Sequence, residues 1–102
     1  MLIIKKLVKE IKEELHGAEN YIKLALEHQD KDEDMADVFC KIAEQEMVHV
    51  SMLHGLVTKV IEKHKKEGKE VPVAMQAVWD YEHENMMEES KEIKMMIAMY
   101  KE

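Results

Sequence analysis

Apolar residues recur at helical spacing along nearly the whole sequence, and this periodicity leaves few folds open to the chain. Two segments interrupt it: a polar run over residues 29–34, and a stretch that contains Gly68 and Pro72. Three glycines and one proline in 102 residues are too few for the many tight turns of a β-sheet protein. The pattern therefore predicts an all-α fold. The expected helices cover about residues 2–28, 35–66 and 73–100.

Each predicted helix has an apolar stripe that we expect to face the core. In the first helix the stripe is Ile4, Leu7, Val8, Ile11, Leu15, Ala18, Ile22, Ala25 and Leu26. In the second it is Val38, Phe39, Ile42, Ala43, Val50, Leu53, Leu56, Val57, Val60 and Ile61. In the third it is Met75, Val78, Trp79, Met86, Ile93, Met96, Ile97 and Tyr100. The short polar turn predicts that the first two helices pack antiparallel, in a single domain over residues 1–102.

Composition narrows the possible partners of the chain. Fifteen basic and 22 acidic residues give a net charge of −7, and lysines alternate with glutamates, so we expect no nucleic-acid partner. No apolar stretch is long enough to span a bilayer, so no membrane segment is expected. Cys40 is the only cysteine, which excludes an intrachain disulfide and favours the cytoplasm. A chain this short buries a modest core, so oligomerisation is expected.

Polar residues stand at four positions where the apolar stripes require a core residue. Glu14 lies between Ile11 and Ala18 at helical spacing. Three others follow the same rule: Glu46, His49 and Glu82. The spacing predicts that all four side chains point inward, so each of the three helices directs a carboxylate at the core. An error of one residue in phase would replace Glu82 by its neighbours His83 or Glu84.

Converging buried carboxylates and an imidazole indicate a metal site. A lone buried carboxylate is costly and tends to protonate, whereas a cation compensates several of them together. In Glu46-x-x-His49 an oxygen donor and a nitrogen donor lie one helical turn apart, within reach of one ion. Carboxylate and imidazole ligands favour iron or manganese over copper(I). The simpler alternative is that these groups are solvated or paired with lysines.

The first two predicted helices resemble those of rubrerythrin-type proteins in the ferritin-like superfamily, over roughly residues 12–56. The similar segments are Glu14-Leu-His-Gly-Ala-Glu-Asn-Tyr21 with Ala25, Met35-Ala-Asp-Val-Phe39, Ala43-Glu-Gln-Glu46 and His49. The resemblance implies a carboxylate-bridged di-iron site in which Glu14 is the ligand from the first helix, Glu46 the bridging ligand and His49 a terminal ligand. Tyr81-Glu-His-Glu84 is similar to the start of the family's third helix, which makes Glu82 the matching ligand candidate.

The chain also departs from the family pattern. A complete site takes a second Glu-x-x-His from a fourth helix, and neither is present. The encapsulated ferritins, which the chain resembles in length and in carrying half a bundle, complete their site across a subunit interface. That resemblance implies a homodimer or a higher even-numbered homo-oligomer. The cysteine-rich rubredoxin-like module of full rubrerythrins is absent, so electrons would come from an external donor.

Together these features predict a protein that binds two iron ions and oxidises ferrous iron with oxygen or peroxide. Glu14, Glu46 and His49 are the predicted catalytic residues, and Glu82 is the fourth predicted metal ligand. Two alternatives stay open. One is a non-catalytic helical oligomer for assembly or partner binding, and the other is a di-manganese protein that decomposes peroxide.

Overall fold

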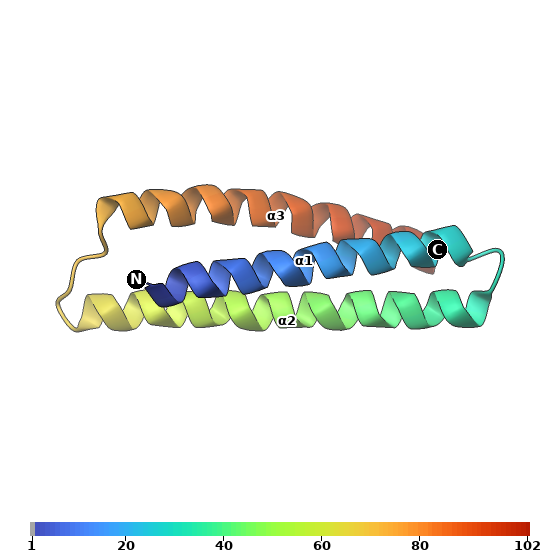
Figure 1. Cartoon of the computed structure of the whole chain (residues 1–102), viewed down its shortest axis with the longest axis horizontal. Helices are drawn as coiled ribbons and strands as arrows, with labels where there is room; N and C mark the ends of the chain where they lie inside the picture. Colours follow the sequence, from blue (N-terminus) through green and yellow to red (C-terminus); the bar gives the residue numbers. More distant parts are fainter. Residues whose placement is uncertain (1) are drawn as a thin grey trace.

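The computed structural model describes residues 2–102 as three long helices joined by two short turns (Figure 1). They are α1 (Leu2–His28), α2 (Glu33–Lys66) and α3 (Val73–Lys101). The described residues contain no strand, and the fold is all-α as the sequence predicts. The predicted domain also includes Met1, which lies outside the described residues. None of the described helices combines the length and apolar character needed to cross a membrane.

Local chemistry sets the ends of the helices. Asp32 is the N-cap of α2, and its carboxylate accepts a hydrogen bond from the backbone N–H of Met35 at 3.1 Å. Because Asp32 caps the helix, α2 begins two residues earlier than the predicted residue 35. Gly68 follows the last turn of α2 with a φ of 74°, a conformation that favours glycine. Pro72 then stands directly before α3, where its missing N–H leaves no helical bond unmade.

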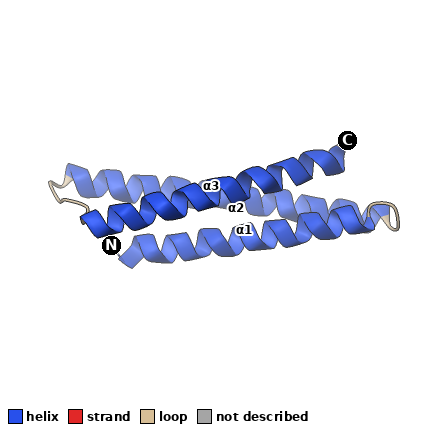
Figure 2. Ribbon diagram, turned by 90° about the horizontal axis from the view of Figure 1, so that it is seen from above, coloured by secondary structure: helices blue, strands red, loops and turns tan. Residues whose placement is uncertain are grey.

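The three helices lie up, down and up along one long axis, so that α1 and α3 run in the same direction (Figures 1 and 2). α1 and α2 form a closely packed hairpin; α3 packs mainly on α1 and touches α2 little. The molecule measures 56 × 20 × 18 Å. Its accessible surface is 6980 Å², whereas a compact monomer of its mass has about 6000 Å². Much apolar surface therefore stays uncovered in one chain.

The buried core agrees with the predicted stripe of α1 better than with that of α2. Every stripe residue of α1 is buried or half-buried. In α2 the buried side chains are Ala36, Cys40, Ala43, Met47 and Val57. Two predicted core residues of α2, Val38 and Leu56, are 54% and 47% exposed. Val78, a predicted core residue of α3, is 51% exposed. The predicted inner stripe of α2 is thus rotated relative to the observed one, because α1 and α3 together cover only part of its apolar surface.

Three hydrogen bonds fasten the C-terminal end of α3 to the rest of the chain. The Tyr100 hydroxyl donates to Asp37 of α2, and Lys101 Nζ donates to Glu44 at 2.7 Å. Gln29, in the turn after α1, donates to the backbone carbonyl of Tyr100 at 2.8 Å. This end of α3 is therefore held by specific polar contacts in addition to apolar packing.

The Tyr100 contact stabilises the protein at neutral pH, and its contribution is lost at alkaline pH. The hydrogen bond to Asp37, together with burial, raises the pKa of Tyr100 from 10.0 to about 12. Because the folded pKa lies above the unfolded one, this contribution is complete below pH 10 and is lost as pH rises to about 12. We expect Tyr100→Phe to remove the tyrosinate absorbance step near pH 12 and to lower the unfolding midpoint most below pH 10. A step that persists in the variant would assign it to another tyrosine.

Candidate metal centre

One face of the α1–α2 hairpin carries the predicted ligands, and we call it the hairpin face. Cross-helix contacts define it: Glu14 meets His49, Gly17 meets Glu46, and the Tyr21 and Phe39 rings lie 6.0 Å apart. Its residues recur at intervals of three and four along both helices, as in a packing seam. They are Glu14, Gly17, Tyr21 and Leu24 of α1, and Met35, Phe39, Ile42, Glu46, His49, Leu53 and Leu56 of α2. All of them are half-buried or exposed within one chain.

Three of the four predicted ligands come together on the hairpin face. Nδ1 of His49 lies 3.3 Å from Oε2 of Glu14, which joins α2 to α1. When Nδ1 carries the proton it donates to this carboxylate, and the other ring nitrogen keeps a lone pair that can bind a metal. Glu46 lies one turn before His49 in α2. Glu14 and His49 are therefore in contact, and Glu46 lies one turn away on the same face, whereas their role as metal ligands stays a prediction.

Glu46 has a buried oxygen with no hydrogen-bond partner. Among the described residues that are not exposed, its Oε2 is the only fully buried side-chain nitrogen or oxygen atom without one. Burial, followed by the negative charge of Glu14, raises the pKa of Glu46 above its ordinary value, and His49 partly offsets this effect. An unpartnered buried carboxylate oxygen is costly unless a proton or a cation compensates it.

Gly17 provides the space in which the Glu46 carboxylate lies. A β-carbon at Gly17 would lie 2.9 Å from Cδ and 3.0 Å from Oε1 of Glu46, and closer still to Oε2. No real side chain has such contacts, so any residue other than glycine would displace the carboxylate. A glycine inside a helix costs about 0.5–1 kcal/mol relative to alanine, and here it leaves room for the present position of the Glu46 carboxylate.

The burial predicted for these ligands is wrong within one chain. The side chains of Glu14 and His49 are 30% and 54% exposed, and no charged residue in the described range is buried. The reason is that α3 packs on other faces of the hairpin: its polar contacts are with residues such as Lys12 and Glu44, which the hairpin face does not include. The ligands lie on an open apolar face, and only a further molecule on that face would bury them.

Glu82 does not join the other three predicted ligands in the structure. Its carboxylate forms an ion pair of 2.6 Å with Lys12 of α1, and its side chain is 20% exposed. Neither alternative on α3 contacts the three either: Glu84 is exposed, and His83 lies against His54 of α2. Among the contacts described for residues 2–102, α3 therefore contributes nothing to the hairpin face.

The sequence pattern did not indicate the contact between His54 and His83. His54 belongs to none of the predicted ligands or apolar stripes; it is half-buried, and its Nε2 lies 2.9 Å from Nε2 of His83. Burial, followed by the nearby His83, lowers the pKa of His54. The two residues are 29 positions apart, so no local spacing could have indicated the pair. Cys40 is buried as expected for a packing residue, and burial raises the pKa of its thiol.

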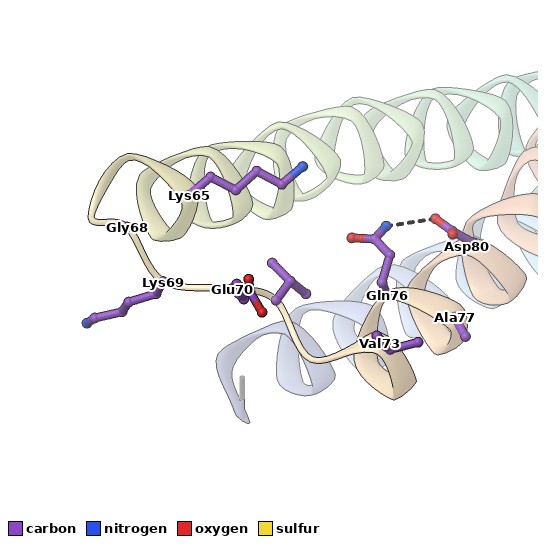
Figure 3. Close-up of a pocket in the computed structure, with 9 residues that line it drawn as sticks. Lys65, Gly68, Lys69, Glu70, Val73, Gln76, Ala77 and Asp80 are labelled. Carbon is purple, nitrogen blue, oxygen red and sulfur yellow. Dashed lines mark hydrogen bonds between the residues drawn. The ribbon is translucent and has the colours of Figure 1, made fainter.

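An open pocket lies away from the hairpin face, at the turn between α2 and α3 (Figure 3). Lys65, Lys69 and Glu70 line it, and Gln76 donates a hydrogen bond to Asp80 at 2.9 Å. None of the predicted metal ligands lines this pocket. Its charges are of both signs, so it offers no concentrated field for an ion of either sign.

The donor types on the hairpin face are compatible with a metal ion. Two carboxylates and an imidazole are suitable donors for iron or manganese, and Glu46 supplies an unpartnered oxygen. No three acidic, histidine or cysteine side chains within residues 2–102 are grouped closely enough to hold an ion by themselves. One chain therefore offers at most a partial ligand set within the described residues.

Comparison with known proteins found no matching family model, no matching curated protein and no matching solved structure. The resemblance to the ferritin-like superfamily therefore stays a prediction from the sequence motifs around Glu14, Glu46 and His49.

Proposed function

We propose that this chain is a ferritin-like, rubrerythrin-type half-bundle that binds ferrous iron between two copies and oxidises it with oxygen or peroxide. The observation that carries the proposal is the buried, unpartnered Oε2 of Glu46, held against Gly17 and beside Glu14 and His49 on one face. Iron supplies the redox chemistry, since each ferrous ion gives one electron to the oxidant. The protein supplies ligands, charge and exclusion of water.

Each residue of the hairpin face has a separate task in this proposal. Glu46 would hold the metal with its buried, unpartnered oxygen and is the candidate bridging ligand by the resemblance, and Glu14 would add a carboxylate from the neighbouring helix. Glu14 also orients the His49 ring through its 3.3 Å contact, so that one nitrogen stays available as a ligand. Tyr21 and Phe39 contribute apolar surface beside the ligands, which restricts water when the face is covered.

A second copy is the proposed cover of the hairpin face. Leu56 is 47% exposed and Met35 is 37% exposed, although both lie on a seam of apolar residues. Two such faces related by a two-fold axis would place two sets of Glu14, Glu46 and His49 opposite each other. That arrangement gives the second Glu-x-x-His that one chain lacks, and it buries ligands that are half-exposed in isolation.

Iron content measured on protein of known oligomeric state tests the function. We expect two ferrous ions per dimer, and oxidation of these ions that is faster than in protein-free buffer. Iron binding by the monomer at one ion per chain would contradict the shared site. A dimer that binds no ferrous iron would favour the non-catalytic oligomer, and a preference for manganese with peroxide decomposition would favour the di-manganese alternative.

Ile42 offers a test of the interface that leaves every predicted ligand in place. It lies on the hairpin face one turn before Glu46 and is half-buried in one chain. We expect Ile42→Glu to dissociate the dimer, because dimerisation would have to bury an unpaired charge. Iron binding should be lost with it, although the three ligands are unchanged. Sedimentation and metal analysis of the same sample measure both effects.

Val48 provides the matched control for Ile42. It is 58% exposed on α2 and does not belong to the hairpin face. Val48→Glu adds the same charge to the same helix, and we expect it to leave both the dimer and its iron content intact. Dissociation by both variants would show that added charge, rather than this face, is responsible.

A further inference from the structure

His54 of α2 and His83 of α3 meet at a point where these two helices otherwise touch little. Their Nε2 atoms lie 2.9 Å apart, and the rings are 5.0 Å between centroids with a tilt of 35°. Trp79 lies one turn before His83, with its ring 5.3 Å from His83 and 6.0 Å from His54. Two ring nitrogens thus face each other across a helix interface, beside an aromatic side chain that restricts their orientation.

The distance between the two nitrogens fits two ligands of one metal ion. An imidazole nitrogen binds a metal at about 2.0–2.1 Å, so two such bonds at a right angle place the nitrogens about 2.9 Å apart. A tetrahedral angle would place them about 3.3 Å apart. A single proton shared in an N–H···N hydrogen bond accounts for the same contact.

The surroundings of the pair favour a particular class of ion. A pocket of about 280 Å³ adjoins both histidines, with room for the waters that would complete a coordination shell. Ser51, Met86 and Lys94 are among the residues that line it, and none of its lining residues is a carboxylate. Calcium and magnesium need oxygen ligands, whereas imidazoles suit copper(II), nickel and zinc.

We propose that His54 and His83 form a two-imidazole site for a divalent ion of the copper, nickel and zinc group. The ion ties α3 to α2, which share little other contact. The site is separate from the hairpin face, because none of the described contacts joins either histidine to Glu14, Glu46 or His49. This proposal can therefore be tested independently of the proposed iron site.

Copper(II) is the probe for this site, because it binds nitrogen ligands most tightly among these ions and is visible by electron paramagnetic resonance. The titration uses the full chain with Glu46→Ala and His49→Ala, so that the hairpin face does not compete. We expect one copper(II) per chain, with hyperfine splitting from two nitrogens. The bound ion should also raise the unfolding midpoint, since it binds the folded state alone.

Single substitutions at the pair decide the assignment. His54→Gln and His83→Gln in the same background should each weaken copper(II) binding by at least the roughly 10–100-fold that loss of a supporting group around a ligand causes. His28→Gln is the matched control, since His28 is a half-buried histidine without a histidine neighbour in the described contacts, and it should bind copper(II) unchanged. Wild-type affinity in either pair variant, or an equal loss in the control, overturns the proposal.

A measurement on the unsubstituted chain covers the case in which a variant does not fold. Addition of zinc should shift the ring proton resonances of both His54 and His83 together, and those of His28 and His64 should stay in place. Shifts spread over all histidines, or absent from the pair, would leave only the hydrogen bond between the two rings.

Discussion

Replacement of Glu46 by alanine is expected to abolish ferrous iron binding while the helices and the dimer persist. Glu46 is the proposed bridging ligand, and its Oε2 is a buried oxygen without a partner in the protein. Loss of a bridging carboxylate removes a bond from both ions and the negative charge that attracts them. Metal analysis after anaerobic loading, together with ferrous oxidation kinetics, measures the loss.

For the same variant we also expect a change in how the stability of the metal-free protein depends on pH. Because the folded pKa of Glu46 is raised, its ionisation opposes folding, and the contribution of this group to stability falls as pH rises above the ordinary value of 4.5. Glu46→Ala removes this penalty, so the gap between the two unfolding midpoints should move in favour of the variant from pH 4 to pH 7. A variant that loses iron because it unfolds would show the opposite trend.

Glu82→Ala is the control that separates a ligand from an acidic neighbour. In the structure Glu82 is ion-paired with Lys12 and lies away from the other three predicted ligands. A site formed by the hairpin faces alone keeps its iron when Glu82 is removed. Loss of iron in Glu82→Ala would mean that α3 of one copy reaches the site of another, as the resemblance to the family implies for this residue.

Gly17→Ala is expected to separate metal binding from stability. A β-carbon at residue 17 overlaps the carboxylate of Glu46, which must swing out of its place. The helix itself gains from the change, because alanine in a helix is favoured over glycine by about 0.5–1 kcal/mol. We therefore expect iron binding to fall at least about tenfold, as loss of a properly held ligand does, while the unfolding midpoint stays level or rises.

Gly55 provides a matched control in the same hairpin. It also lies inside a helix, and a β-carbon there meets no atom within 4 Å. Gly55→Ala should bring the same gain in helix stability with no change in iron content. If Gly17→Ala keeps full iron binding, the carboxylate of Glu46 is not held against Gly17 in the functional state.

The positions of the helices could be predicted from the sequence because their signals are local. The helical period appears within a few turns of chain, and the interrupting residues act where they stand: Asp32 caps α2, and Gly68 adopts the left-handed conformation after it. The meeting of Glu14 with His49 could be predicted for a related reason. A short turn makes α1 and α2 antiparallel neighbours, so residues equally far from the turn lie opposite each other.

The buried face of each helix could not be predicted, because burial depends on which other helix packs against it. α2 has apolar residues on two sides, and its sequence does not distinguish the side that α1 and α3 cover from the hairpin face. Val38 and Leu56 were therefore placed inside, whereas Cys40 and Met47 are the buried residues. The rotation of α3 about its own axis determined the contacts of its polar residues, since it places Glu82 against Lys12 and His83 against His54.

The sequence by itself determined three helices and their approximate ends, and it indicated candidate metal ligands, since each of these follows from chemistry within a few residues. Only the tertiary structure decided which side chains share a face, which of them are exposed to solvent, and which residues of α1 and α2 contact α3. Long-range packing sets these features, because a helix with more than one apolar side can bury any of them, and the choice belongs to the whole assembly of helices.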